Sequence, residues 1–197
     1  MGYYDPYPTH QLEKPLCLVG FMGSEIHMVG YFLSSMTGLP FIELDKWIEH
    51  EVGKTVAHLY YERGEVEWRR VEKKCLNRAL ASQPKSIICL GDGTLIDKES
   101  RRICHQQSTL FYLRRPFHLC YKQILSGRKT HPQRYPYFIQ APPQDESEVE
   151  TYLRKRVGGY EKAHIMMEMK DLSPLAMAQK VMKRLDIEHF HHFLCHS

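Results

Sequence analysis

The chain has 197 residues, a length that suits one domain with a full core. Hydrophobic residues make up 43% and charged residues 25%, which is ordinary for a globular protein, and the net charge of +4 is too small to indicate nucleic-acid binding. There is no run of roughly 18 apolar residues, so no membrane span is expected. The six cysteines are scattered, and several lie in apolar runs, which favours reduced thiols in a cytoplasmic protein.

Short apolar runs alternate with amphipathic, helix-like segments along the chain. This alternation is typical of an α/β protein, and we expect a five-stranded parallel sheet with helices on both faces. The expected strands are residues 16–20, 40–45, 86–90, 108–113 and 164–169. The expected helices are residues 27–37, 46–52, 55–62, 64–82, 97–104, 116–126, 147–162 and 173–188.

Three segments do not fit this alternation. Residues 1–14 are polar and aromatic, without the apolar centre of a signal peptide, and are expected to be an extension that precedes a domain at 15–188. The proline-containing residues 127–146 are expected to form a long, mobile loop or lid. Residues 189–197 contain the residue types of metal sites but no spacing that fixes a geometry, so a frayed C-terminal tail is expected and no metal site.

Residues 16–30, LCLVGFMGSEIHMVG, predict a strand, a glycine-bearing turn and a helix. This is the setting of a phosphate-binding loop, whose pattern is GxxxxGK[ST]. The frame starts at Gly20 and includes Gly23. The glycine, lysine and Ser/Thr that the pattern then requires are replaced by Glu25, Ile26 and His27. On spacing alone, a strand, turn and helix that never bound phosphate explains the stretch equally well.

Each replacement removes a physical contribution to nucleotide binding. Glycine lets backbone N–H groups close around phosphate oxygens, lysine places a positive charge on the β- and γ-phosphates, and the hydroxyl holds Mg²⁺. Glu25 instead brings a negative charge toward a polyanion, and Ile26 supplies no charge. His27 is a poor ligand for Mg²⁺, which prefers oxygen.

Several segments in order over residues 15–186 resemble the shikimate kinase family. They are GFMG at 20–23, LPFIELD at 39–45, EWRRVE at 67–72, the GxG turn at 91–93, and Arg156, Tyr160 and Ala163 near the end. The resemblance identifies the loop as an altered phosphate-binding loop and implies a P-loop kinase fold. For an intact member it also implies phosphorylation of the 3-hydroxyl of shikimate with MgATP.

The acid-binding side of the family pattern is retained. The substrate-binding positions that the resemblance implies are Asp45, Arg69, Gly91, Gly93 and Arg156. Asp45 would contact the ring hydroxyls and is the catalytic position if the protein is active. Arg69, oriented by Glu72, and Arg156 would hold the carboxylate. Asp92 replaces the middle glycine of the turn, and Asp45 could also cap the helix expected at 46–52.

Further positions surround this group in the family pattern. Glu43 stands for an aspartate near Mg²⁺. Tyr60 and Trp68 stand where the pocket has phenylalanines, although packing in the core explains both aromatic residues equally well.

We therefore expect a shikimate kinase-like pseudokinase with no ATP or Mg²⁺ requirement that binds a shikimate-like hydroxy acid. One alternative is an active kinase in which Lys14 or Arg128 supplies the missing cation and ATP and Mg²⁺ are used. Another is a non-catalytic interaction scaffold with an unknown protein partner. No nucleic-acid or membrane partner is expected, and the expected location is the cytoplasm.

Overall fold

The computed structural model describes residues 12–130 and 145–194, and the side chains of Arg128, Thr130 and residues 186–194 are not described. This part of the chain contains a five-stranded sheet of order β2-β3-β1-β4-β5, in which every pairing is parallel. The predicted fold class is therefore confirmed. The strands are β1 (Leu16–Val19), β2 (Phe41–Glu43), β3 (Ile87–Cys89), β4 (Thr109–Arg114) and β5 (Ile165–Glu168).

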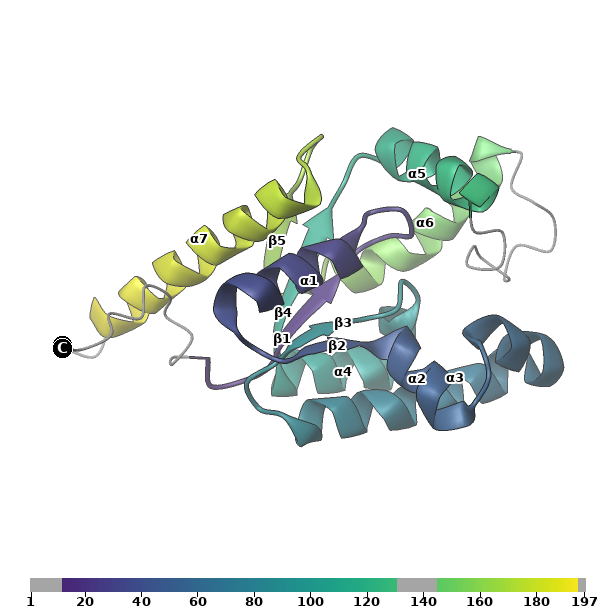
Figure 1. Ribbon diagram of the computed structural model, residues 1–197, viewed down its shortest axis with the longest axis horizontal. Coiled ribbons are helices and arrows are strands. Elements are labelled where there is room, and N and C mark those ends of the chain that lie inside the picture. Colours follow the sequence, from purple (N-terminus) through teal and green to yellow (C-terminus); the bar gives the residue numbers. More distant parts are fainter. Residues whose placement is uncertain (1–11, 131–144, 195–197) are drawn as a thin grey trace.

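Helices connect the strands and cover both faces of the sheet. They are α1 (Ile26–Thr37), α2 (Leu44–Val52), α3 (Val56–Ser82), the 3-10 helix η2 (Thr94–Ile96), α4 (Lys98–Gln107), α5 (Phe117–Thr130), α6 (Glu146–Tyr160) and α7 (Pro174–Leu194). Figure 1 shows α1 beside α7, while α2, α3 and α4 lie together on the other side of the strands. No helix in the described ranges is long and apolar enough to cross a membrane.

The side chains of β1 pack into two cores, one on each face of the sheet. Leu16 and Leu18 belong to the core that includes residues of α1 and α7. Cys17 and Val19 belong to the core that includes residues of α3 and α4. A strand that is buried on both faces has a continuous apolar sequence, which explains why β1 could be predicted.

Some element boundaries differ from those predicted. The helices expected at 55–62 and 64–82 form α3, which kinks at Gly64, where φ is 74° and ψ is 177°. Helix α7 continues beyond residue 188 to Leu194, so part of the expected tail is helical. Helix α5 includes residues 127–130 of the expected lid, and α6 begins at residue 146. Residues 131–144 of the lid, the first eleven residues and residues 195–197 lie outside the described residues, so the expectations for them stay predictions.

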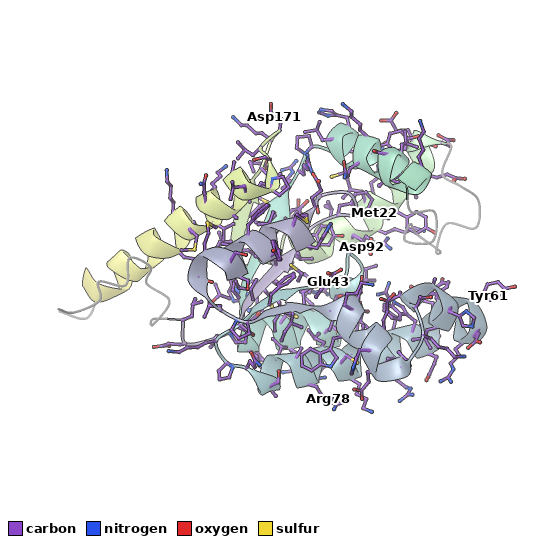
Figure 2. The ribbon with its side chains drawn as sticks, in the orientation of Figure 1. Met22, Glu43, Tyr61, Arg78, Asp92 and Asp171 are labelled. Atoms are coloured by element: carbon purple, nitrogen blue, oxygen red, sulfur yellow. The ribbon has the colours of Figure 1, made fainter. Side chains whose placement is uncertain are left out.

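Because all five strands are parallel, their carboxyl ends meet at one edge of the sheet. Met22 and Asp92 lie in the turns that follow β1 and β3, and Glu43 is the last residue of β2. Figure 2 shows the three residues near one another in the central part of the molecule, with Asp92 between Met22 and Glu43. Ligands of open α/β sheets bind outside this edge, where the strand order reverses. The predicted site residues belong to these turns and to the helices around them.

Candidate functional site

Asp45 lies in the first turn of α2, directly after β2. The helix begins at Leu44, with Glu43 as its N-cap residue, so the suggestion that Asp45 caps this helix is wrong. The buried Oδ1 atom of Asp45 has no hydrogen-bond partner. A buried acceptor without a donor is costly, which makes this oxygen a candidate contact for a ligand.

The turn after β3 comes close to Asp45 because residue 91 is a glycine. A Cβ atom at Gly91 would lie 3.1 Å from Asp45 Oδ1 and the same distance from Glu72 Oε1. Burial raises the pKa of Asp45 to about 7, and neighbouring negative charges add to the shift, from Glu72, Asp92, Glu43 and Glu49. Near neutral pH, Asp45 therefore exchanges readily between acceptor and donor of a hydrogen bond.

Arg69 extends from α3 and packs against the second glycine of the same turn. A Cβ atom at Gly93 would lie 2.4 Å from Arg69 Nη2, so a larger residue there would have to displace the end of the Arg69 side chain. Arg69 Nη1 donates to Glu72 Oε2 at 2.7 Å, and Glu72 Oε1 accepts from Thr94 Oγ1 at 2.7 Å. Glu72 is buried, and burial raises its pKa although Arg69 opposes the shift. The Glu72–Arg69 contact agrees with the role that the resemblance implies for Glu72.

Arg156 reaches the turn from α6 and is 4% exposed. Its Nε atom lies 2.8 Å from Asp92 Oδ2, which makes an ion pair. Neither atom has an aligned hydrogen-bond partner, so the contact is electrostatic and leaves both atoms unsatisfied. Arg156 Nη1 donates to the Tyr152 carbonyl at 3.1 Å, and its guanidinium carbon lies 5.0 Å from the centre of the Tyr152 ring.

Tyr160 fixes the position of the Asp92 backbone. Its hydroxyl donates to the Asp92 carbonyl at 2.5 Å, and the side chain is fully buried. Sequence reasoning noted Tyr160 only as part of the family pattern and gave it no role. Tyr160 contacts Asp92, which is distant in the sequence, so no residue spacing could predict the contact. The one available indication was that Tyr160 follows Arg156 by four residues, which places both on the same helix face.

The loop after β1 is closely packed. A Cβ atom at Gly20 would lie 2.6 Å from Ser24 Oγ and 2.7 Å from Ile26 Cγ2. Ile26 is buried in the core that includes residues of α1 and α7, and His27 is exposed. Gly23 has a φ of 77° and lies against the backbone carbonyl of Cys120, which leaves no room for a side chain.

Glu25 is ion-paired with Arg115, which lies between β4 and α5. Sequence reasoning missed Arg115, although a cation directly after an apolar strand of a parallel sheet lies at the ligand-binding edge. Lys14, a cation suggested to replace the lysine of the loop, lies before β1, at the opposite end of that strand. It donates to the Gln106 carbonyl at 3.0 Å, so it is not beside the loop.

The residues of the loop do not fit the group that a phosphate-binding loop normally holds. Ile26 is packed in the core at the lysine position, and Glu25 is already paired at the glycine position. Among the residues that the structure describes, no cluster of three or more His, Cys, Asp or Glu side chains could hold a metal ion. The acid side, in contrast, brings Asp45, Arg69 and Arg156 to one turn.

The parallel sheet and the glycine-bearing loop at its carboxyl edge define an α/β protein of the P-loop kinase class. The sequence profile of shikimate kinase matches residues 22–186. The chain therefore belongs to the shikimate kinase family.

Individual relatives agree with this assignment. The chain is 32% identical to the shikimate kinase of Dictyoglomus turgidum over 123 residues, which are 62% of this chain and 71% of that protein. It is 27% identical to the shikimate kinase of Persephonella marina over 87% of this chain and 99% of that protein. The structure of the Acinetobacter baumannii shikimate kinase in complex with shikimate superposes with a TM-score of 0.79 at 26% identity, covering 92% of this chain and 98% of that one.

Proposed function

We propose that this member of the shikimate kinase family binds a small hydroxylated ring compound of the shikimate type and does not transfer phosphate from ATP. One observation carries the proposal: Asp45 Oδ1 is buried, has no hydrogen-bond partner and lies beside Gly91, at the turn where Gly93 receives the Arg69 guanidinium. A ligand hydroxyl would supply the missing donor. The shikimate complex of the Acinetobacter baumannii relative supports this type of ligand.

The loop supports the second half of the proposal, that the protein is a pseudokinase with a degenerate phosphate-binding loop. Phosphoryl transfer depends almost entirely on positioning and electrostatic stabilisation. Each charge-assisted hydrogen bond to phosphate that is missing costs about 1.5–3 kcal/mol. With Ile26 buried and Glu25 at the helix start, we expect ATP to bind weakly or not at all.

The proposed domain covers residues 15–188. The described cysteines are buried and unpaired, which supports the proposal of a reducing, cytoplasmic location.

A direct test combines ligand binding with turnover. Shikimate, its methyl ester and MgATP are titrated separately by calorimetry into the wild type, Arg69→Ala and the control Arg70→Ala. Arg70 is the exposed neighbour of Arg69 and pairs with Glu67 instead of reaching the turn. We expect saturable binding of a ring compound in the micromolar to millimolar range, about 4–8 kcal/mol, which Arg69→Ala abolishes and Arg70→Ala retains. ADP release in the presence of shikimate would contradict the proposal, and absence of ring-compound binding by folded protein would favour the scaffold.

An active kinase is the second candidate, and one observation favours it. Arg115 brings a positive charge to the loop, and its buried Nε atom has no hydrogen-bond partner. If Arg115 replaced the lysine of the motif, the wild type would phosphorylate shikimate with MgATP and Arg115→Met would abolish the activity. The ion pair with Glu25 argues against this role, because the Glu25 carboxylate already compensates the positive charge of Arg115.

A further inference from the structure

Three buried polar atoms without hydrogen-bond partners surround the turn after β3. They are Asp45 Oδ1, Asp92 Oδ2 and Arg156 Nε. An ionised carboxylate oxygen only accepts hydrogen bonds, and a guanidinium nitrogen only donates. Asp92 Oδ2 therefore needs a donor and Arg156 Nε needs an acceptor, whereas Asp45, with a pKa of about 7, can use either. Hydroxyl groups offer both, whereas a carboxylate offers acceptors only.

Both arginines at this turn already have a carboxylate from the protein itself. Arg69 is hydrogen-bonded to Glu72, and Arg156 is ion-paired with Asp92. Further negative charge lies close by, because Glu43 and Asp92 act electrostatically on Asp45. A ligand carboxylate would find its cations already compensated and would lie next to like charges, which weakens its binding.

The backbone of Asp92 is held in place, which restricts where its side chain can lie. The Tyr160 hydroxyl holds the Asp92 carbonyl at 2.5 Å, and Gly91 and Gly93 on either side are both closely surrounded. The turn therefore cannot easily carry the Asp92 carboxylate away from Arg156. Displacing Asp92 from Arg156 would also leave its carboxylate without a cation in a partly buried place.

We propose that Asp92 determines the ligand specificity of the site at this turn by occupying the place of a ligand carboxylate, so that the site selects an uncharged polyhydroxy ring over the corresponding acid. The inference rests on the proposed function and names the ligand class of that site. The ligand hydroxyls donate to Asp45 and Asp92, and a hydroxyl oxygen accepts from Arg156. The charge of Asp92, and not its size alone, makes the selection.

The test compares two probes that share ring hydroxyls and differ in charge, shikimate and its methyl ester. Calorimetric dissociation constants are measured for the wild type, Asp92→Gly, Asp92→Asn and the control Asp171→Asn. Asp92→Asn keeps the size of the side chain, so it reports on charge even if Asp92→Gly alters the turn. Asp171 is exposed and lies away from Asp92 in Figure 2, so its variant corrects for the change in overall charge.

In the wild type and in Asp171→Asn, we expect the ester to bind at least about tenfold more tightly than the acid. In Asp92→Asn and Asp92→Gly, we expect the acid to gain about tenfold or more and the preference to disappear or reverse. Wild type that binds the acid as tightly as the ester would overturn this inference and leave the proposed function standing. An ester preference that both Asp92 variants keep would overturn the role of Asp92. If no folded variant binds either probe, the proposed function fails together with the inference.

Discussion

Glu25 and Arg115, 90 positions apart in the sequence, form an ion pair that joins the start of α1 to the segment between β4 and α5. Glu25 has a φ of 61°, a left-handed conformation in which glycine carries no penalty and other residues cost about 1–2 kcal/mol. Its carboxylate does not cap α1 by a hydrogen bond. The negative charge that the sequence placed at the phosphate position is thus compensated by the protein, and the pair ties the loop to the neighbouring segment.

The first prediction concerns the strength of this pair. Both side chains are mostly buried, with 20% of Glu25 and 12% of Arg115 exposed, so removing one partner leaves a partly buried charge. We expect Glu25→Gln or Arg115→Met to lower the free energy of unfolding by about 1–3 kcal/mol. In urea denaturation, the double variant should lose less than the sum of the two single losses. A double-mutant cycle with no coupling would show that the pair does not stabilise the protein.

The second prediction concerns nucleotide binding. The variant Glu25→Gly, Ile26→Lys, His27→Ser restores the glycine, the lysine and the hydroxyl of the motif. We expect it to bind MgATP at least about tenfold more tightly than the wild type, because each charge-assisted contact contributes about 1.5–3 kcal/mol. Titration with a fluorescent ATP analogue measures the change. Circular dichroism checks that the lysine introduced at a core position has not unfolded α1. A micromolar dissociation constant for ATP in the wild type would contradict the account of this loop.

The third prediction concerns pH. Burial raises the pKa of Asp45 from 3.8 to about 7, so the folded protein binds the proton more tightly than the unfolded chain. The contribution of Asp45 to stability is therefore most favourable below pH 3.8 and is lost progressively as the pH rises to about 7. Relative to the wild type, Asp45→Asn should gain stability over this range, by a few kcal/mol at most near pH 8.

Urea denaturation of both proteins between pH 4 and pH 8 measures this difference, with Asp171→Asn as a control for an exposed carboxyl. A stability difference for Asp45→Asn that did not change with pH would show that burial does not raise the pKa of Asp45 in the folded protein.

The fourth prediction uses two glycines that have open space around them. At both Gly64 and Gly158, a Cβ atom would meet nothing within 4 Å, but only Gly64 has a positive φ. The φ of 74° and ψ of 177° at Gly64 are almost exclusive to glycine. Gly64→Ala should destabilise the protein by about 1–3 kcal/mol. Gly158→Ala, inside α6, should stabilise it by about 0.5–1 kcal/mol. Equal effects of the two substitutions on the thermal midpoint would show that the kink in α3 does not require glycine.

The fold could be predicted from local sequence patterns, because each buried strand is a continuous apolar run and each helix has its own periodicity of apolar residues. The strands β1 and β3 are clear examples, as is the break at Gly64, which sequence reasoning placed as a helix boundary and the structure shows as a kink. The family pattern brought Asp45, Arg69 and Gly93 into one site, and their contacts are consistent with that grouping. Their roles in binding stay a proposal.

The ion pairs of the site could not be predicted from sequence spacing. Asp92 meets Arg156, and Glu25 meets Arg115, only because the parallel sheet brings the ends of distant strands and helices to one edge. Each pair includes a carboxylate at a position where the family pattern has glycine. The sequence showed both carboxylates as departures from the pattern and Arg156 as a site residue, but it indicated neither Arg115 nor the pairing of either carboxylate.

The most direct test of the central claim is a single NMR experiment on ¹⁵N-labelled wild type. The methyl ester of shikimate is added to saturation, MgATP follows, and the ³¹P spectrum of the same sample is recorded over several hours. The account predicts saturable shifts of the amide signals of Asp45, Gly91 and Gly93 with the ester, no saturable shifts in residues 20–27 with MgATP, and ATP phosphorus signals that stay unchanged. Transfer of phosphate from ATP to the ring compound, or amide signals at the turn that do not respond to the ester, would contradict it.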